Sequence, residues 1–229
     1  MISVLIPVYN TPPNHLRQCI DSVLDQTEQN FEIVIIDNQS DVPEVIELLN
    51  ELNNHEKITV LSCERQQGKK NLSVALNAGL KVCKYDLIAR LDSDDIMTPD
   101  RLEKQLRKMQ EGDVDILGGQ CSQMSTGIVS RVMPEKIPPN MFYYRDHFLN
   151  HPTVMFKKEK ILGVGGYNES PDHISEDFML WSKCLQAGCK IENLKDTVLV
   201  YRDGQQNSLS TNDSKHVNWQ KSIIAASTN

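Results

Sequence analysis

Short apolar runs alternate with amphipathic segments over the first 118 residues, and this alternation constrains the fold more than any other feature. We interpret the apolar runs as strands at residues 3–6, 31–36, 58–61, 87–91 and 116–118. Continuous apolar runs of this length are typical of strands that are covered on both faces. The alternation therefore predicts an α/β fold with a Rossmann-like, mostly parallel central sheet and helices on both of its faces.

Four segments between these strands carry apolar residues at helical spacing, and prolines mark the entry of three of them. The residues expected on the buried helix faces are Leu16, Ile20, Val23, Leu24, Val45, Ile46, Leu49, Leu72, Ala75, Leu76, Gly79, Leu80, Leu102, Leu106 and Met109. Pro7 directly follows the first apolar run, and we expect it to end the first strand because proline lacks a backbone N–H.

The second half of the chain is less regular than the first. Its pattern predicts strands at residues 153–156 and 197–201, and a helix at residues 175–187 that ends before Gly188. A length of 229 residues suits one domain. We therefore expect a single domain over residues 1–229, with a smaller region at residues 119–202 and a polar tail at residues 203–229.

Charge and hydropathy exclude several classes of protein. The formal net charge of −7 argues against a nucleic-acid-binding protein, which usually carries a basic face. The N-terminus lacks the charged and long apolar regions of a signal peptide, and no apolar run approaches the roughly 20 residues that span a bilayer. We expect a cytoplasmic protein without a transmembrane segment, whose association with a membrane is peripheral or through a partner.

Acidic residues directly follow two of the predicted strands. Asp37 follows residues 31–36, and Asp92 follows residues 87–91 with Asp94 and Asp95 close behind. Ligands of open α/β sheets bind at the carboxyl ends of the strands. Carboxylates packed this closely repel one another unless a positive charge lies among them, and Mn²⁺ or Mg²⁺ takes oxygen ligands from both carboxylates and phosphates. The pattern predicts a divalent metal ion and a diphosphate at residues 92–95.

A simpler interpretation of the acidic cluster remains open. Acidic residues are common before helices, and Asp94 or Asp95 could cap the helix expected after Pro99. A three-residue acidic pattern is weak evidence by itself. Its position at a strand end favours the metal site.

Six segments in a fixed order resemble the family 2 glycosyltransferases, which are inverting enzymes of GT-A fold. The resemblance covers about residues 3–202, and the matching segments are residues 4–10, 35–40, 71–79, 90–95, 165–167 and 175–181. Each segment is weakly diagnostic alone, and the ordered set is specific. The resemblance implies a nucleotide-sugar-binding half at residues 1–118 and an acceptor-side half at residues 119–202.

The resemblance also implies a role for individual residues near the donor. Those that would bind the nucleotide sugar are Pro7, Val8, Tyr9, Asp37, Asp92, Ser93, Gly166 and Tyr167. Asp94 would bind the metal directly, and Asp92 would contact the ribose or reach the metal through water. Asp177 would accept the proton of the acceptor hydroxyl, with Glu176 as the second candidate. Acidic residues in a first helical turn also favourably meet the helix dipole, which is the structural alternative for this pair.

The implied activity is a single displacement with a divalent metal ion. A sugar would pass from a nucleoside diphosphate, with UDP favoured, to a hydroxyl of a glycan, lipid-linked or protein acceptor. Two alternatives are a nucleotidyltransferase of similar fold and a module that binds sugar nucleotides without turnover. A nucleotidyltransferase typically has a glycine-rich, basic loop after the first strand, and residues 7–13 contain no glycine.

Four positions depart from the family pattern, and one of them is Asn71, where many members have glycine. Asn38 and Gln39 stand where the usual motif has aspartate and glycine, so we expect a different turn after Asp37. Many relatives carry a histidine after the last strand, whereas Asp203 follows Arg202 here. Without this histidine, the expectation that a C-terminal loop closes over the site has less support from the resemblance.

Overall fold

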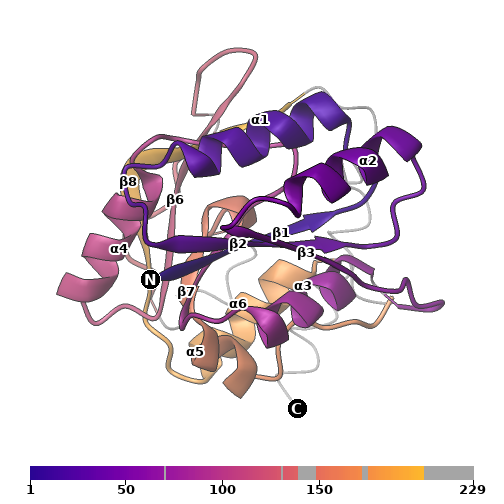
Figure 1. Cartoon of the computed structure of the whole chain (residues 1–229). Helices are drawn as coiled ribbons and strands as arrows, with labels where there is room; N and C mark the ends of the chain where they lie inside the picture. The colour runs from indigo at the N-terminus through magenta and orange to yellow at the C-terminus, as the bar shows by residue number, and fades with distance from the viewer. Residues whose placement is uncertain (70, 130, 139–147, 172–174, 204–229) are drawn as a thin grey trace.

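A mixed sheet of eight strands forms the centre of the part of the chain that the computed structural model describes, which is residues 1–69, 71–129, 131–138, 148–171 and 175–203 (Figure 1). The strands are β1 (Ile2–Val8), β2 (Phe31–Asp37), β3 (Ile58–Ser62), β4 (Leu87–Arg90), β5 (Ile96–Met97), β6 (Ile116–Gln123), β7 (Met155–Lys157) and β8 (Ile191–Tyr201). Their order across the sheet is β3-β2-β1-β4-β7-β6-β8-β5. The tail expected at residues 203–229 lies outside these ranges apart from Asp203.

Strands β1 to β4 are parallel, and β7 enters antiparallel between β4 and β6. β8 is parallel to β6, and the short β5 pairs antiparallel with β8. The prediction of an α/β fold with a mostly parallel sheet is confirmed. Because β4, β6 and β8 run in the same direction as β1 and β2, all five have their carboxyl ends at one edge of the sheet.

Helices cover both faces of the sheet, as predicted (Figure 1). The helices are α1 (Pro13–Leu24), α2 (Pro43–Leu52), α3 (Asn71–Val82), α4 (Arg101–Glu111), α5 (Lys158–Gly163) and α6 (Glu176–Gln186). Helices α1, α2 and α4 contribute to one apolar core, and α3, α5 and α6 contribute to a second core across the sheet. None of the helices in the described ranges has the length and apolar character needed to cross a membrane. The cytoplasmic location stays a prediction.

The structure corrects several expected boundaries. β1 continues through Pro7 to Val8, because Pro7 pairs with Ile36 of β2 while the ladder with β4 has already ended at Leu5. The missing N–H therefore falls where no partner strand requires it. Ile46 of α2 is 41% exposed, so its expected burial is wrong.

Elements of the second half also differ from expectation. The strand expected at residues 153–156 is present as β7, which begins two residues later, and a 3₁₀ helix, η2 (His151–Thr153), precedes it. β6 and β8 are longer than expected, and the short elements α5 and β5 were not predicted. The expected division between residues 118 and 119 falls inside β6. The assignment of residues 1–229 to one domain with two functional halves stays a prediction.

Helix α3 packs closely against the sheet at Gly79. A Cβ atom at this position would lie 2.2 Å from Leu5 Cδ1 and 3.2 Å from Ile36 Cγ1. Such distances are below van der Waals contact, so only glycine allows α3 to approach β1 and β2 this closely.

We predict that Gly79→Ala lowers the free energy of unfolding by about 1–3 kcal/mol, because the added methyl overpacks the core. Urea denaturation measures the change. Gly163→Ala is the matched control, because a Cβ atom at Gly163 meets nothing within 4 Å. We expect this control to be neutral or stabilising by up to about 1 kcal/mol, and an equal loss in both variants would contradict the packing argument.

Candidate active site

The acidic turn at residues 92–95 begins where β4 ends, and a buried arginine holds its first residue. Arg90 is 2% exposed, and its Nη1 donates to Asp92 Oδ2 at 2.7 Å while its Nη2 donates to Asp92 Oδ1. Burial alone would lower the pKa of Arg90, but the Asp92 carboxylate outweighs it and raises that pKa. A two-pronged ion pair of this kind fixes both the position and the plane of the carboxylate.

A second buried arginine lies beneath the same turn. Arg101 of α4 is fully buried and donates to the carbonyl oxygens of Arg90 at 2.8 Å and Pro152 at 2.9 Å. Burial, followed by the nearby Arg90 cation, lowers the pKa of Arg101 to about 9, so it remains charged at neutral pH. Sequence patterns did not predict that these two cations are buried, because arginine is ordinarily a surface residue.

The remaining carboxylates of the turn are crowded and partly removed from water. Burial raises the pKa of Asp94, and the Asp92 carboxylate raises it further. For Asp95 the same two causes raise the pKa to about 8. Asp95 Oδ1 accepts from the backbone N–H of Arg202 at 2.9 Å, which joins the turn to the end of β8. α4 begins at Arg101 with Asp100 at its N-cap, so neither Asp94 nor Asp95 caps that helix.

The donor set of the turn fits a metal ion that is shared with a ligand. Within the described residues, no group of three or more histidine, cysteine or acidic side chains is arranged to hold a metal alone. Asp92 is already engaged by Arg90, which leaves Asp94 as the candidate for direct coordination. Mg²⁺ commonly uses one or two carboxylates together with substrate phosphates and water. A cation here would also relieve the crowding that raises the pKa of Asp94.

Ser93 joins the acidic turn to the loop after β1. Its hydroxyl is buried and shares a 2.6 Å hydrogen bond with Thr11 Oγ1. The side chain is thus engaged within the fold, and its expected contact with the nucleotide sugar stays a prediction.

Of the three residues expected to bind the nucleotide at the end of β1, only Tyr9 exposes its side chain. Pro7 and Val8 are buried, whereas Tyr9 is 47% exposed. The Arg65 guanidinium lies over the Tyr9 ring with its carbon 4.0 Å from the ring centroid. An aromatic ring beside a guanidinium offers a surface on which a nucleobase can stack. Arg65 was missed as a site residue because its contact with Tyr9 is long-range.

The turn after β2 is closed by the side chain of Asp37. Asp37 Oδ1 accepts from the Ser40 N–H at 3.0 Å, and the Asn38 N–H donates to the Val8 carbonyl at 2.8 Å. Gln39 adopts φ = 56°, a left-handed conformation that glycine adopts at lower cost. The turn therefore keeps the geometry that a glycine would favour, despite the departure from the family motif.

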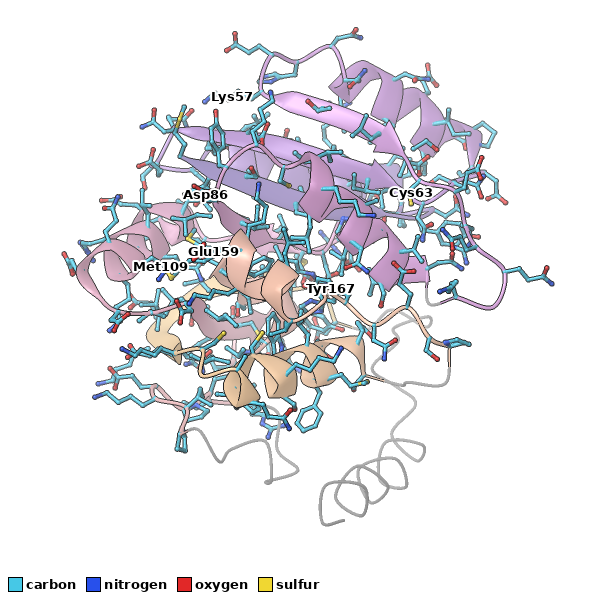
Figure 2. All side chains as sticks on the ribbon, turned by 90° about the horizontal axis from the view of Figure 1, so that it is seen from below. Lys57, Cys63, Asp86, Met109, Glu159 and Tyr167 are labelled. Carbon is cyan, nitrogen blue, oxygen red and sulfur yellow. The ribbon has the colours of Figure 1, made fainter. Side chains whose placement is uncertain are left out.

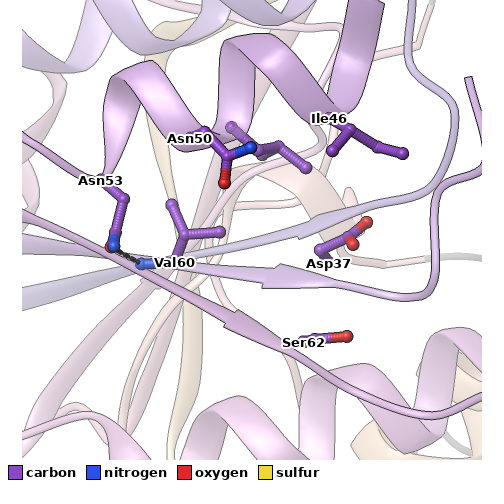
Figure 3. A pocket seen from close by; sticks show the side chains of 7 residues that line it. Asp37, Ile46, Asn50, Asn53, Val60 and Ser62 are labelled. Carbon is purple, nitrogen blue, oxygen red and sulfur yellow. Dashed lines mark hydrogen bonds between the residues drawn. The ribbon is translucent and has the colours of Figure 1, made fainter. Parts of the chain in front are cut away.

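A small pocket opens beside Asp37 (Figure 3). It has a volume of about 200 Å³ and lies between α2 and β3, with Asp37 and Ser62 at the strand ends. Small-molecule sites usually occupy about 300–1,000 Å³, so this pocket is too small for a whole nucleotide sugar. Of the residues expected at the donor site, only Asp37 lines it.

Two of the matching segments meet at Asn77. Asn77 of α3 accepts from the Tyr167 N–H at 2.9 Å and donates to the Tyr167 carbonyl at 2.9 Å. Its Nδ2 also donates to Glu169 at 2.9 Å. Gly166 has φ = 69°, and a Cβ atom there would lie 2.7 Å from Asn77 Oδ1. Both the backbone conformation and the close approach require glycine at this position.

Tyr167, labelled in Figure 2, is buried rather than exposed to a ligand. Its hydroxyl and His151 Nε2 are 3.0 Å apart. Burial raises the pKa of the Tyr167 phenol, Arg90 lowers it, and Glu176 and Asp177 raise it. The phenol therefore lies within electrostatic reach of Arg90 and of the start of α6. Its expected place beside the donor sugar stays a prediction.

Asp177 lies in the first turn of α6, as expected. Its Oδ1 accepts the N–H of Phe178 at 2.8 Å, so it meets the helix N-terminus in the way that the structural alternative requires. Phe178, Trp181 and Leu185 are buried and anchor the helix. The structure thus fixes where Glu176 and Asp177 lie, and their chemical roles stay predictions.

Comparison with known proteins assigns the chain to a family. Residues 3–163 match the family model described as glycosyl transferase family 2. The O-antigen biosynthesis glycosyltransferase WbnJ of Escherichia coli is 36% identical over 210 residues, which are 88% of this chain and 79% of that protein. A UDP-Gal:alpha-D-GlcNAc-diphosphoundecaprenol beta-1,3-galactosyltransferase of Escherichia coli is 31% identical over 206 residues, 87% of this chain and 73% of that protein. The chain therefore belongs to glycosyl transferase family 2, a family of glycosyltransferases.

A solved structure establishes the architecture. The crystal structure of S. aureus TarS 1-349 in complex with UDP-GlcNAc matches with a TM-score of 0.73 at 19% identity, over 92% of this chain. This chain spans 60% of that solved chain. The shared architecture is the GT-A fold that the motifs predicted. Membership of the family also decides against the nucleotidyltransferase alternative.

We predict that Asn77→Asp lowers the free energy of unfolding by about 1–3 kcal/mol, because it removes two part-buried hydrogen bonds and places a carboxylate beside Glu169. Chemical denaturation at pH 7 measures the loss. Asn30→Asp makes the same change in charge at an exposed position and should alter stability little. Equal stability of the Asn77 variant and the wild type would contradict the role given to Asn77.

Proposed function

We propose that this chain transfers a sugar from a nucleoside diphosphate to an acceptor hydroxyl, with inversion at the anomeric carbon and with Mn²⁺ or Mg²⁺ as cofactor. The observation that carries the proposal is the acidic turn at residues 92–95, which stands at the same sheet edge as Asp37 and the Tyr9–Arg65 stack. The phenol of Tyr167 lies within electrostatic reach of Arg90, whose guanidinium holds Asp92, and of Asp177 at the start of α6. The acidic turn would thus serve the donor, and Asp177 would serve the acceptor.

Uridine diphosphate is the donor nucleotide that we favour. TarS was solved with UDP-GlcNAc, and the galactosyltransferase relative is named for UDP-Gal. In this chain the exposed face of Tyr9 would stack on the base, Arg65 would flank it, and Asp37 would accept a hydrogen bond from base or ribose.

The transfer needs one base and no protein nucleophile. Asp177 would take the proton of the acceptor hydroxyl as the oxygen forms its bond to the anomeric carbon. The bond from that carbon to the diphosphate breaks in the same step, and the diphosphate leaves with the bonding electrons. Asp94 would hold the divalent ion, and the ion would offset the negative charge that develops on the departing diphosphate.

A saccharide acceptor is the one that we favour. WbnJ is named for O-antigen biosynthesis, and the galactosyltransferase is named for a sugar linked to diphosphoundecaprenol. These relatives support a glycan or lipid-linked sugar over a protein. The opposing hypothesis is a module that binds sugar nucleotides without turnover, and it predicts binding with no release of nucleoside diphosphate.

We predict that Asp177→Asn lowers the turnover number by about a thousandfold while nucleotide affinity stays within twofold, because the variant loses only the base. Asp94→Asn should instead abolish the effect of Mn²⁺ on UDP affinity. Released nucleoside diphosphate is measured over a panel of donors and saccharide acceptors, and affinity is measured by calorimetry.

Asp113→Asn serves as the control, because Asp113 precedes β6 at the opposite edge of the sheet and pairs with Lys190 at the surface. It should turn over like the wild type. Unchanged turnover of Asp177→Asn would overturn the assignment of the base. Binding without any release of nucleoside diphosphate by the wild type would favour the non-catalytic module.

A further inference from the structure

Arg101 has no part in the transfer described above, although it is one of the largest fully buried side chains. Its Nη2 donates to the carbonyl oxygens of Arg90 at 2.8 Å and Val154 at 3.4 Å, and its Nη1 donates to that of Pro152 at 2.9 Å. Its Nε donates to Gln105 Oε1 at 3.0 Å. One side chain therefore ties the end of β4 to residues 152–154.

The burial of the Arg101 cation lowers the stability of the folded chain. The four hydrogen-bond acceptors of Arg101 are neutral, and the nearest cation, Arg90, opposes its charge. A buried charge without a carboxylate bonded to it costs several kcal/mol, and an apolar residue of similar size would avoid that cost. Arg101 also fixes the positions of the carbonyl groups that it contacts, because its planar guanidinium donates each N–H in a fixed direction.

The first group that Arg101 fixes is Arg90, which carries the acidic turn. The Arg90 N–H donates to the Val154 carbonyl at 2.9 Å, and the Arg90 carbonyl accepts from Arg101. Both the N–H and the carbonyl of Arg90 are therefore hydrogen-bonded, and its guanidinium is paired with Asp92. The Asp95 N–H then closes the turn on the Asp92 carbonyl at 3.2 Å. Arg101 thus supports the strand end from which the turn begins, in addition to the contacts that Ser93 and Asp95 make.

The second group is η2, which carries His151. Pro152 lies in η2 and accepts from Arg101, and Gln105 donates to the Thr153 carbonyl at 2.8 Å. His151, at the start of η2, is hydrogen-bonded to the Tyr167 hydroxyl. Through Arg101 and Gln105, helix α4 therefore contacts both the strand end before the acidic turn and η2, which carries His151.

We propose that Arg101 is a positioning residue that sets the acidic turn for binding the diphosphate of the donor with its divalent ion. The inference rests on the proposed function and adds a residue that touches neither donor nor acceptor. It predicts that a change at Arg101 alters ligand affinity beyond any loss of stability.

The direct test is Arg101→Lys, which keeps the charge and removes the planar fork. An ammonium group cannot meet the Arg90 carbonyl, the Pro152 carbonyl and Gln105 in the present geometry. Calorimetry with UDP in the presence of Mn²⁺ should show at least tenfold weaker binding, and electron paramagnetic resonance should show weaker binding of Mn²⁺. In donor kinetics, KM should rise more than kcat falls.

Gln120→Leu is the matched control for a purely structural effect. Gln120 of β6 is buried and donates to the carbonyl oxygens of Met133 at 3.1 Å and Leu194 at 2.8 Å, away from the acidic turn. Its loss should lower stability and leave UDP affinity unchanged. Gln105→Leu is the second test variant if Arg101→Lys does not fold, and several-fold weaker UDP binding is expected of it.

The outcomes separate the inference from the function on which it rests. A wild-type protein that binds neither UDP nor Mn²⁺ overturns both. Wild-type binding together with Arg101→Lys, or Gln105→Leu in its place, within twofold of the wild type overturns only the role of Arg101. An equal loss of affinity in Gln120→Leu also overturns that role, because the effect would then follow from stability.

Discussion

The balance of charge at the end of β4 is the constraint on which the rest of the site depends. Three carboxylates stand within four residues, and two buried guanidinium groups lie directly beneath them. Either set alone would be unfavourable, since the carboxylates repel one another and the arginines have lost their hydration. Together they offset one another's charge in the folded chain. A ligand that binds there meets a fixed arrangement, and less of its binding energy is spent on ordering the protein.

The strand register and helix α3 position the residues of the candidate site relative to one another. The register that pairs Val8 with Asp37 and Leu5 with Arg90 aligns the ends of β1, β2 and β4. Helix α3 is set against this sheet by the close approach at Gly79, and two positions earlier its Asn77 holds the loop at Tyr167. The same helix therefore links the position of the sheet to that of the loop at Tyr167.

Sequence patterns predicted what depends on local periodicity and missed what depends on distant contacts. Apolar runs and their spacing predicted the strands and helices of the first half. They also predicted that Asp37 and Asp92 lie at the same edge of the sheet. α5, β5 and η2 are too short to show a period. Ile46 has the right spacing but faces the rim of a pocket. Arg65, Arg90 and Arg101 gave no indication of their roles, because only the folded chain shows that they stack on Tyr9 or lie beneath the acidic turn.

The proposed function requires the turn at residues 92–95 to hold a divalent ion and the diphosphate of a nucleotide sugar. Crystals grown with Mn²⁺ and UDP test it most directly, because anomalous scattering locates manganese without reference to the protein chain. We expect one strong peak coordinated by the Asp94 carboxylate and by oxygen atoms of UDP, with Asp92 still paired to Arg90. UDP bound with manganese coordinated elsewhere, or bound away from this turn, would contradict it.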